Sequence, residues 1–288
     1  MSNPKLVSSY QIKHGDRIIT PLYANACGNT FLIYDLTAEN VKKTWDRVRS
    51  DIWDLLKTAS VDDALALEAI KKDQDRLQVN MHVLEPDGTQ ADFCGNGARS
   101  VGHYLMEKYG VQYRNIELVS RKGVHDMQME AGTCFIDMGT PEMQPSPLHF
   151  EFEGKEYEFY LVDVSERHLV TRDAPWSTEL LTRMGLALNK QWNDRFPHGI
   201  NLNAVIVPQF EENRLQVMTF ERGVYRITQS CGTGSVGSCQ VAINNLWINP
   251  NFPHYRINTL GGELRIKRDE NNRLWLGGNV LFNSTNIT

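Results

Sequence analysis

The sequence predicts a mixed α/β (α+β) fold made of two halves that repeat one another. Two Cys-Gly-x-Gly turns begin at Cys94 and Cys231, 137 residues apart in a chain of 288, and each opens a segment with helical spacing. Glycines that bracket strand-like segments recur 139 residues apart, first as Gly123 and Gly139 and then as Gly262 and Gly278. Two matched offsets, each close to half of the chain, indicate a duplicated unit of strands and helices.

Hydrophobic periodicity locates the elements of the first half. Apolar residues at Val41, Trp45 and Val48 recur at helical spacing, whereas the segment 77–84 alternates between apolar and polar residues. Helical spacing resumes after the first Cys-Gly-x-Gly turn and stops at Gly110, a residue type that often ends helices. The expected elements are a strand over 29–34, a helix over 36–57, a strand over 77–84 ending at the turn Pro86-Asp-Gly, a helix from Cys94 to Gly110, and strands over 116–119 and 127–138.

A proline-rich break marks the expected boundary between the halves. Pro141, Pro145 and Pro147 follow the 127–138 strands, and proline interrupts regular structure. We expect an N-terminal half of residues 1–140, joined by a C-terminal strand over 277–288, and a C-terminal half of residues 141–276. A ligand-binding cleft is expected between the two halves.

Composition excludes several classes of function. The chain carries 30 basic and 35 acidic residues, a net charge of −5, so no basic surface is expected to recruit nucleic acid or anionic lipid. No apolar run approaches the roughly 20 residues that span a bilayer, and the first residues lack the apolar core of a signal peptide. We therefore expect a cytoplasmic protein with no nucleic-acid or membrane partner.

The cysteines fit neither a disulfide framework nor a zinc site. They occupy positions 27, 94, 134, 231 and 239, an odd number without zinc-ribbon spacing. Cys134, in an alternating apolar strand, and Cys239, inside a helix, have the character of small buried hydrophobic residues. Cys27 has no assigned role. No pyridoxal lysine motif or metal-binding cluster is evident, so neither a cofactor nor a metal is expected.

The two Cys-Gly-x-Gly turns have the composition of an anion site with an acidic thiol. Glycine allows the backbone to approach a ligand closely, and the free N–H groups of a first helical turn bind a carboxylate. The same partial positive charge favours a thiolate over a thiol. One such turn is common in proteins, but two in matched positions of duplicated halves predict one carboxylate site with a sulfur on either side.

Stereoinversion next to a carboxylate requires that arrangement. One thiolate removes the α-proton, and the opposite thiol returns a proton to the other face of the carbon. N–H donors aimed at the carboxylate stabilise the charge that develops on it, and exclusion of water strengthens them. The residues themselves therefore predict a cofactor-independent amino-acid racemase or epimerase in which Cys94 and Cys231 exchange roles with direction.

Four segments resemble diaminopimelate epimerases, and the similarity runs nearly end to end. They are Asn25-Ala-Cys-Gly-Asn-Thr-Phe-Leu-Ile-Tyr-Asp, Pro86-Asp-Gly-Thr-Gln-Ala-Asp-Phe-Cys94-Gly-Asn-Gly-Ala-Arg, Phe196-Pro-His-Gly-Ile-Asn201, and Glu221-Arg222-Gly followed by Cys231-Gly-Thr-Gly. The resemblance implies two pseudo-symmetric halves, each a mixed sheet wrapped around a central helix, with the active site in the cleft between them. It also implies the catalytic roles already argued for the two cysteines.

Departures from the family pattern bear on the substrate. Asp63, Glu85 and Glu166 stand where the family has three neutral amides, and the segment from Glu221 to Cys231 is one residue longer. Three acids would disfavour a substrate with a distal carboxylate, even though Arg222 matches the family's carboxylate clamp. Glu85 or Glu166 could instead pair with Arg222. We therefore expect an amino acid with a cationic side chain: lysine, ornithine, arginine or histidine.

The remaining site residues follow from helix ends and from the resemblance. The expected substrate-binding set is Asn29, Asp63, Glu85, Gly95, Asn96, Glu166, His168, Asn201, Glu221, Arg222, Gly232 and Thr233. The four residues that follow the cysteines would hold the α-carboxylate. His168 is expected to orient its neighbours or to pack in the cleft wall.

Several alternatives stay open. The chain could be a diaminopimelate epimerase proper, a proline or hydroxyproline racemase, or a non-catalytic amino-acid binding protein. A compact cyclic substrate would leave the acids nothing to bind, and mere binding would need no pair of proton carriers. A thiol–imidazole hydrolase using His168 would leave the second cysteine turn unexplained. The expected partner is a small amino acid, and a homodimer stays open.

Overall fold

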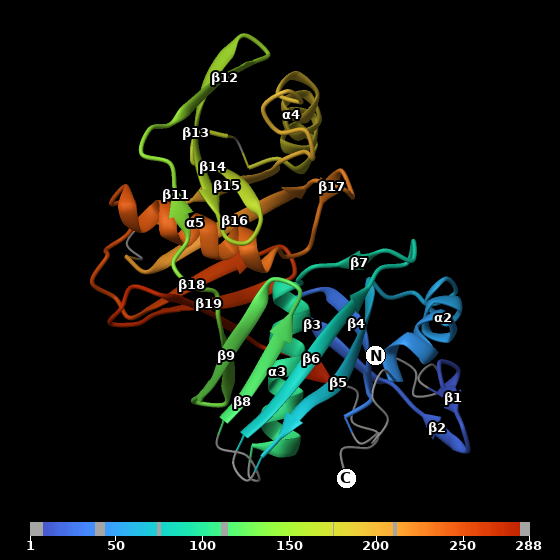
Figure 1. The fold of residues 1–288 in the computed structure, drawn as a ribbon. Helices are drawn as coiled ribbons and strands as arrows, with labels where there is room; N and C mark the ends of the chain where they lie inside the picture. Colours follow the sequence, from blue (N-terminus) through green and yellow to red (C-terminus); the bar gives the residue numbers. More distant parts are fainter. Residues whose placement is uncertain are drawn as a thin grey trace. The chain divides into compact units, whose positions relative to one another are not determined.

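The computed structural model describes residues 8–37, 44–73, 76–110, 115–174, 176–209 and 212–282. It is a mixed α/β structure whose described residues form the helices α2 (Thr44–Leu56), α3 (Gly95–Tyr109), α4 (Thr178–Gln191) and α5 (Gly232–Asn244) (Figure 1). The chain divides into two compact units. The first comprises the described residues of Met1–Ile136 and Gly278–Thr288, and the second comprises Asp137–Gly277.

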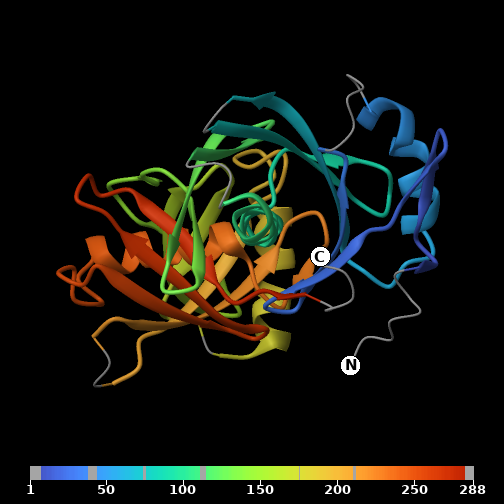
Figure 2. The same ribbon diagram turned by 90° about the horizontal axis from the view of Figure 1, so that it is seen from below.

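A mixed sheet forms the first unit. Its strands are β21 (Leu281–Phe282), β3 (Leu22–Ala26), β4 (Asn29–Asp35), β5 (Asp63–Lys72), β6 (Arg76–Leu84), β7 (Gln90–Ala91), β8 (Asn115–Ser120), β9 (Gly123–Glu130) and β10 (Thr133–Asp137). The pairs β4–β5 and β6–β8 are parallel, and the other pairs are antiparallel. A hairpin of β1 (Ile12–His14) and β2 (Arg17–Ile19) stands apart. Helix α3 contacts β3, β4 and β8, and Figure 2 shows it end-on with strands of its unit around it.

The second unit repeats this order of pairings. Its strands are β11 (Glu142–Met143), β12 (Leu148–Phe152), β13 (Lys155–Asp163), β14 (Arg167–Thr171), β15 (Asn201–Ile206), β16 (Arg214–Glu221), β17 (Arg226–Ile227), β18 (His254–Thr259), β19 (Gly262–Arg268) and β20 (Leu274–Gly278). The series β13–β14–β15–β16–β18–β19 pairs antiparallel, parallel, antiparallel, parallel and antiparallel. The series β3–β4–β5–β6–β8–β9 pairs in the same way. Helices α3 and α5 occupy the same place in the two series.

Alternation along the strands gives each sheet two distinct faces. In the first unit, Leu32 and Ala64 pack in one buried cluster with Trp45 of α2. In the second, Leu202 and Phe220 pack with Leu181 of α4 in the equivalent cluster. The residues that alternate with these in each strand face α3 or α5; examples are Leu65 of β5 and Asn203 of β15. Each sheet therefore has one face covered by α2 or α4 and another that faces the helix begun by a Cys-Gly-x-Gly turn.

The tight packing of α3 and α5 against their sheets explains glycine at two positions. A Cβ on Gly97 would lie 3.1 Å from Leu65 of β5. A Cβ on Gly234 would lie 3.0 Å from Asn203 of β15 and 3.1 Å from Thr219 of β16. The second glycine of each Cys-Gly-x-Gly turn is therefore needed for the helix to approach the sheet closely.

Most local expectations for the first unit are confirmed, with two differences. The expected strands over 29–34, 77–84 and 116–119 correspond to β4, β6 and β8, and the segment 127–138 falls in the β9–β10 hairpin. The helix expected over 36–57 begins at Thr44; Leu36 instead extends the sheet by donating its N–H to Leu67 O at 2.8 Å, and residues 38–43 lie outside the described residues. Gly110 ends α3 with a right-handed φ of −62°, not the left-handed conformation that favours glycine.

The C-terminal strand expected over 277–288 is described only in part. Leu281 and Phe282 pair with β3 as β21, and residues 283–288 lie outside the described part of the chain. Among the described helices, none is long and apolar enough to cross a membrane.

Candidate active site

Cys94 is the N-cap residue of α3. Its backbone is extended (φ −132°, ψ 113°), and its Sγ accepts a hydrogen bond from the N–H of Gly97 at 3.3 Å. The side chain is partly exposed. The sulfur therefore lies at the positive end of a 15-residue helix, in a position to act as a hydrogen-bond acceptor.

Cys231 occupies the equivalent place on α5. Its backbone has nearly the same conformation (φ −121°, ψ 117°), and its Sγ accepts from the N–H of Gly234 at 3.4 Å. The Thr233 hydroxyl lies 3.4 Å from the same sulfur. In contrast to Cys94, this residue is only 8% exposed.

The surroundings of Cys231 correct the expectation that both thiols are acidic. Burial raises the pKa of Cys231 well above its ordinary value, and the negative charge of Glu221 raises it further. Hydrogen bonds from Thr233 and Gly234 act in the opposite direction but do not compensate. Loss of hydration outweighs the helix end at this position, so the Cys231 thiol is protonated.

Three polar side chains are linked beside Cys94. Asn96 donates from Nδ2 to Asn29 Oδ1 at 2.7 Å, and its own Oδ1 accepts from Arg99 Nη2 at 3.1 Å. The amide orientation of Asn96 is thereby fixed, because Arg99 has only donors to offer. The structure brings together Asn29 and Asn96, two of the expected substrate-binding residues, at the start of α3.

Asp63 and Glu85 lie on the same sheet face in the first unit. Ala64 pairs with Leu84 across the antiparallel β5–β6 ladder, so Asp63 and Glu85 follow at the next position on the face that looks toward α3. Glu85 accepts a 2.5 Å hydrogen bond from the Thr89 hydroxyl in the turn that follows β6. Both carboxylates are partly exposed, so they contribute charge to this end of the sheet at a modest desolvation cost.

His168 forms a hydrogen-bonded chain that leads to Cys231. Its Nε2 lies 3.0 Å from Thr233 Oγ1, and its Nδ1 lies 3.3 Å from Asn203 Nδ2. Asn203 Nδ2 also donates to Gly234 O at 3.2 Å, so this atom is an amide nitrogen and His168 Nδ1 must accept. The imidazole therefore carries its proton on Nε2 and donates it to Thr233, leaving the Thr233 hydroxyl free to donate to the sulfur. Burial lowers the pKa of His168 to about 3, so the ring is neutral.

Glu166 forms an ion pair with Arg222. The Arg222 Nη2 to Glu166 Oε1 distance is 3.2 Å, with both side chains about one third exposed. Asn201 donates from Nδ2 to the other oxygen, Glu166 Oε2, at 3.3 Å, and its Oδ1 accepts the Arg222 backbone N–H at 2.9 Å. Of the acids considered from the sequence, Glu166 is the one that pairs with this arginine.

Glu221 is a buried carboxyl beside the second thiol. Burial raises its pKa, and hydrogen bonds from Thr228, at 2.5 Å, and from Cys231 lower it in part. The nearby charge of Glu166 raises it further. Of the two expected site acids in the second unit, Glu166 is paired with an arginine, and Glu221 has an ionised form that burial disfavours.

Three residues with evident roles were not singled out in the sequence. Asn203 sets the tautomer of His168, Thr228 binds Glu221, and Arg99 binds Asn96. Asn203 stands two residues after Asn201, so strand alternation places both on one face and was the available signal. Arg99 lies inside the first Cys-Gly-x-Gly-Ala-Arg segment, but nothing local showed that its side chain turns inward.

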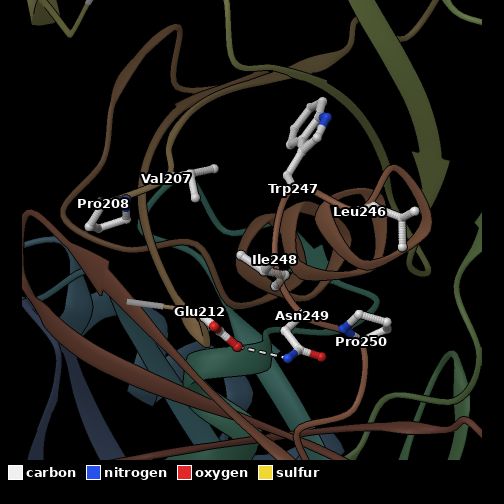
Figure 3. Close-up of a pocket in the computed structure, with 8 residues that line it drawn as sticks. All are labelled: Val207, Pro208, Glu212, Leu246, Trp247, Ile248, Asn249 and Pro250. Carbon is white, nitrogen blue, oxygen red and sulfur yellow. Dashed lines mark hydrogen bonds between the residues drawn. The ribbon is translucent and has the colours of Figure 1, made fainter. Parts of the chain in front are cut away.

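A surface pocket of the second unit is separate from this chemistry. It is lined by Val207, Pro208 and Glu212 and by the segment 246–250 that follows α5 (Figure 3). Cys231 precedes the opposite end of α5, and a helix rises 1.5 Å per residue, so the pocket is ~20 Å from the sulfur. In the described residues there is also no group of three or more His, Cys, Asp or Glu that could hold a metal ion.

Comparisons with known proteins identify relatives of the chain. It is 29% identical over 259 residues to the diaminopimelate epimerase of Thermotoga maritima, across 89% of this chain and 96% of the relative. It is 24% identical over 258 residues to the diaminopimelate epimerase of Pseudomonas fluorescens, across 83% and 87% of the two chains. The structure of a hydroxyproline epimerase from Agrobacterium vitis, with bound trans-4-OH-L-proline, matches with a TM-score of 0.66 at 13% identity over 94% of this chain and 92% of that one. No protein-family model matches the chain.

The chain is thus a distant homologue of diaminopimelate epimerases, with a fold shared by hydroxyproline epimerases. Identities below 30% leave the substrate to be argued from the side chains themselves.

Proposed function

We propose that the protein is a pyridoxal-phosphate-independent amino-acid racemase or epimerase in which Cys94 and Cys231 act on opposite faces of one α-carbon. The observation that carries the proposal is the equivalence of the two cysteines. Each is the N-cap of the equivalent helix in its unit, and each Sγ accepts the N–H of the residue three positions later. A duplicated binding fold would need the helix ends, but it would not need a sulfur at both.

The reaction transfers one proton in each of two steps. A thiolate takes the α-proton, so the Cα–H bond breaks, an S–H bond forms, and the electron pair stays on the α-carbon and its carboxylate. The opposite thiol then gives its proton to the other face, which forms a new Cα–H bond and leaves a thiolate. Electrons and protons balance without an oxidant or a cofactor, and the two sulfurs have exchanged protonation states.

Backbone groups at both helix ends would stabilise the intermediate. The N–H groups at Gly95 and Asn96, and those at Gly232 and Thr233, belong to first helical turns that lack intrahelical partners for them. We assign the substrate α-carboxylate to these donors, where its charge grows as the proton leaves. A neutral His168 fits this scheme, because it orients the Thr233 hydroxyl toward Cys231 without adding a competing charge.

The side-chain end of the substrate is proposed to be cationic. Arg222, the residue suited to a distal carboxylate, is already paired with Glu166. Asp63 and Glu85 add two further carboxylates at the α3 face of the first unit. A lysine, ornithine, arginine or histidine side chain would be attracted by these acids, whereas a second carboxylate would be repelled.

Two other substrates have specific support. The relatives named above are diaminopimelate epimerases, which favours that reaction, and the matched structure contains a hydroxyproline. The paired state of Arg222 opposes the first, because a distal carboxylate would have to displace Glu166. Asp63 and Glu85 oppose a hydroxyproline substrate, because a compact ring would leave these two carboxylates without a ligand.

Wash-out of the α-hydrogen in deuterated water tests the proposal. Single amino acids, including lysine, ornithine, arginine, histidine, proline and diaminopimelate, are incubated with the protein, and deuterium at Cα is measured by NMR with chiral analysis of the product. We expect exchange and inversion for a basic amino acid. Cys239→Ala, which alters a buried thiol in the same helix as Cys231, is the matched control and should keep activity. Absence of exchange for every amino acid would refute the racemase.

A further inference from the structure

Helix α2 binds the turn that connects β6 to β7. Arg49 Nη2 donates to Gly88 O at 3.0 Å, and Trp53 Nε1 donates to Pro86 O at 3.1 Å. These two side chains are four residues apart, so they lie on the same face of the helix. The turn that they bind begins at Glu85, one of the acids assigned to the side-chain end of the substrate.

The Trp53 ring packs directly against the backbone of this turn. A Cβ on Gly88 would lie 2.7 Å from Trp53 Cε2, and the φ of Gly88 is +88°, which favours glycine. Trp53 itself packs against the buried cluster that α2 forms with the sheet. The hydrophobic core therefore fixes the ring, and the ring limits where the turn can lie.

Arg49 also binds the residue that follows the turn. The Gln90 side-chain amide, with its oxygen toward the guanidinium, accepts from Arg49 Nε at 3.0 Å and from Nη1 at 3.1 Å. The amide must have this orientation because arginine has only donors. With its bond to Gly88 O, one rigid guanidinium thus binds the turn at two positions, which restricts the turn more than a single hydrogen bond would.

Hydrogen bonds inside the turn carry this restraint to the Glu85 carboxylate. The Glu85 N–H donates to Thr89 O at 3.0 Å, and the Gly88 N–H donates to Glu85 O at 2.9 Å. The Thr89 hydroxyl lies 2.5 Å from Glu85 Oε2 and 2.6 Å from Asp87 Oδ1. A hydroxyl has one proton to donate, so the turn presents two carboxylates to a single donor. The turn therefore carries an excess of negative charge that a cationic ligand would neutralise.

We propose that Arg49 and Trp53 are positioning residues that hold Glu85, through the 85–90 turn, where it selects a cationic substrate side chain. The inference rests on the proposed function, in which Glu85 attracts that side chain. A carboxylate on a mobile turn would lose conformational freedom when it binds an ammonium group, and this loss weakens binding. Contacts with α2 remove the loss before the substrate arrives. The helix thus contributes to selectivity although it packs on the sheet face opposite to α3.

Binding of racemic lysine and racemic norleucine tests the proposal. Norleucine lacks the ammonium group, and a racemic ligand keeps its composition even if the protein inverts it. Dissociation constants are measured by calorimetry. We expect Arg49→Gln and Trp53→Phe each to lower the preference for lysine by about fivefold, with little change for norleucine, and Arg49→Lys to retain part of the preference. The control is Arg47→Gln, which changes an exposed arginine of the same helix and should leave the preference unchanged.

A double-mutant cycle separates positioning from a general loss of structure. If Arg49 acts through Glu85, Arg49→Gln should not reduce the lysine preference further in a protein that already carries Glu85→Gln. An equal further reduction in that protein, or a loss of norleucine binding as large as the loss of lysine binding, would overturn the proposal. Arg49 is exposed, so its variants are expected to fold and decide the outcome even if Trp53→Phe does not.

Failure of this proposal is distinguishable from failure of the proposed function, because calorimetry requires no turnover. A protein that prefers lysine, loses that preference in Arg49→Gln and exchanges no α-hydrogen would refute the racemase and leave the role of α2 intact. A racemase that prefers lysine equally with and without Arg49→Gln would refute only the positioning role. An unmodified protein without preference for lysine over norleucine would refute both the cationic substrate and the role of α2.

Discussion

Replacing two acids at the proposed distal end of the substrate should change what the enzyme accepts. In the double variant Glu85→Gln, Glu166→Asn, two negative charges disappear and Arg222 loses the partner that lies 3.2 Å from it. Both changes act in the same direction. A distal cation loses two attractive charges, and a distal carboxylate gains an available guanidinium.

The expected magnitude follows from the geometry of the ion pair. Two unit charges 3.2 Å apart interact by about 1–3 kcal/mol at an effective dielectric constant of roughly 40–80, a range that allows for side chains about one third exposed. Each lost carboxylate would withdraw about 1 kcal/mol from a distal ammonium. The two lost carboxylates and the released arginine together should therefore move the preference between the two substrate classes by about 3–5 kcal/mol, or roughly 150-fold to several thousand-fold.

The assay is kcat/KM for lysine, ornithine, arginine, histidine and diaminopimelate on the unmodified and double-variant proteins. The control is Glu179→Gln, which breaks another Glu–Arg pair of 3.2 Å, with Arg183, on the exposed side of α4. We expect the control to change no ratio. If diaminopimelate is the best substrate of the unmodified enzyme, the argument from the acids is wrong although the thiol mechanism survives.

Three other predictions follow from the described contacts and the proposed reaction. Cys94→Ala and Cys231→Ala should each abolish inversion with unchanged circular dichroism, and mixing the two variants should not restore it; substantial inversion by either would contradict a two-thiol reaction. Oxidation should inactivate the enzyme reversibly, because the Cys94 and Cys231 sulfurs, if they serve one α-carbon, can form a disulfide when no substrate is bound. Full activity after prolonged oxidation, without added reductant, would argue against paired thiols. Asp35→Asn should lower the free energy of unfolding by about 2–4 kcal/mol at pH 7, since the carboxylate accepts hydrogen bonds from Tyr104 at 2.6 Å and Lys108 at 2.8 Å. Burial opposes ionisation of Asp35, but these hydrogen bonds hold its pKa below the ordinary value. The stability difference between the two proteins should therefore persist above about pH 4 and decrease as the pH falls through the folded-state pKa. Urea unfolding of both proteins at pH 7 and at about pH 3 measures this difference.

The strands and helices that carry the two cysteines were predictable because their signals are local. Alternation identified β6, and the glycine-rich turns marked the starts of α3 and α5. The start of α2 was not predictable in the same way, because Leu36 has an apolar side chain that fits a helical pattern. Its backbone N–H, however, bonds to Leu67 in a neighbouring strand. Tertiary pairing, which leaves no periodic trace in the sequence, decided that boundary.

The same distinction between local sequence signals and tertiary contacts applies to the site residues. The cysteines stand in a motif, but the protonation states of their thiols depend on contacts between segments far apart in the chain. Glu221 lies ten residues before Cys231, yet it raises the pKa of that thiol through a contact made when β16 meets the start of α5. Arg99 bonds to the carbonyl of Asn279, 180 positions away, and that contact holds the guanidinium inside the first unit. The two motifs look equivalent in the sequence, whereas in the structure Cys231 is buried beside Glu221 and Cys94 is partly exposed.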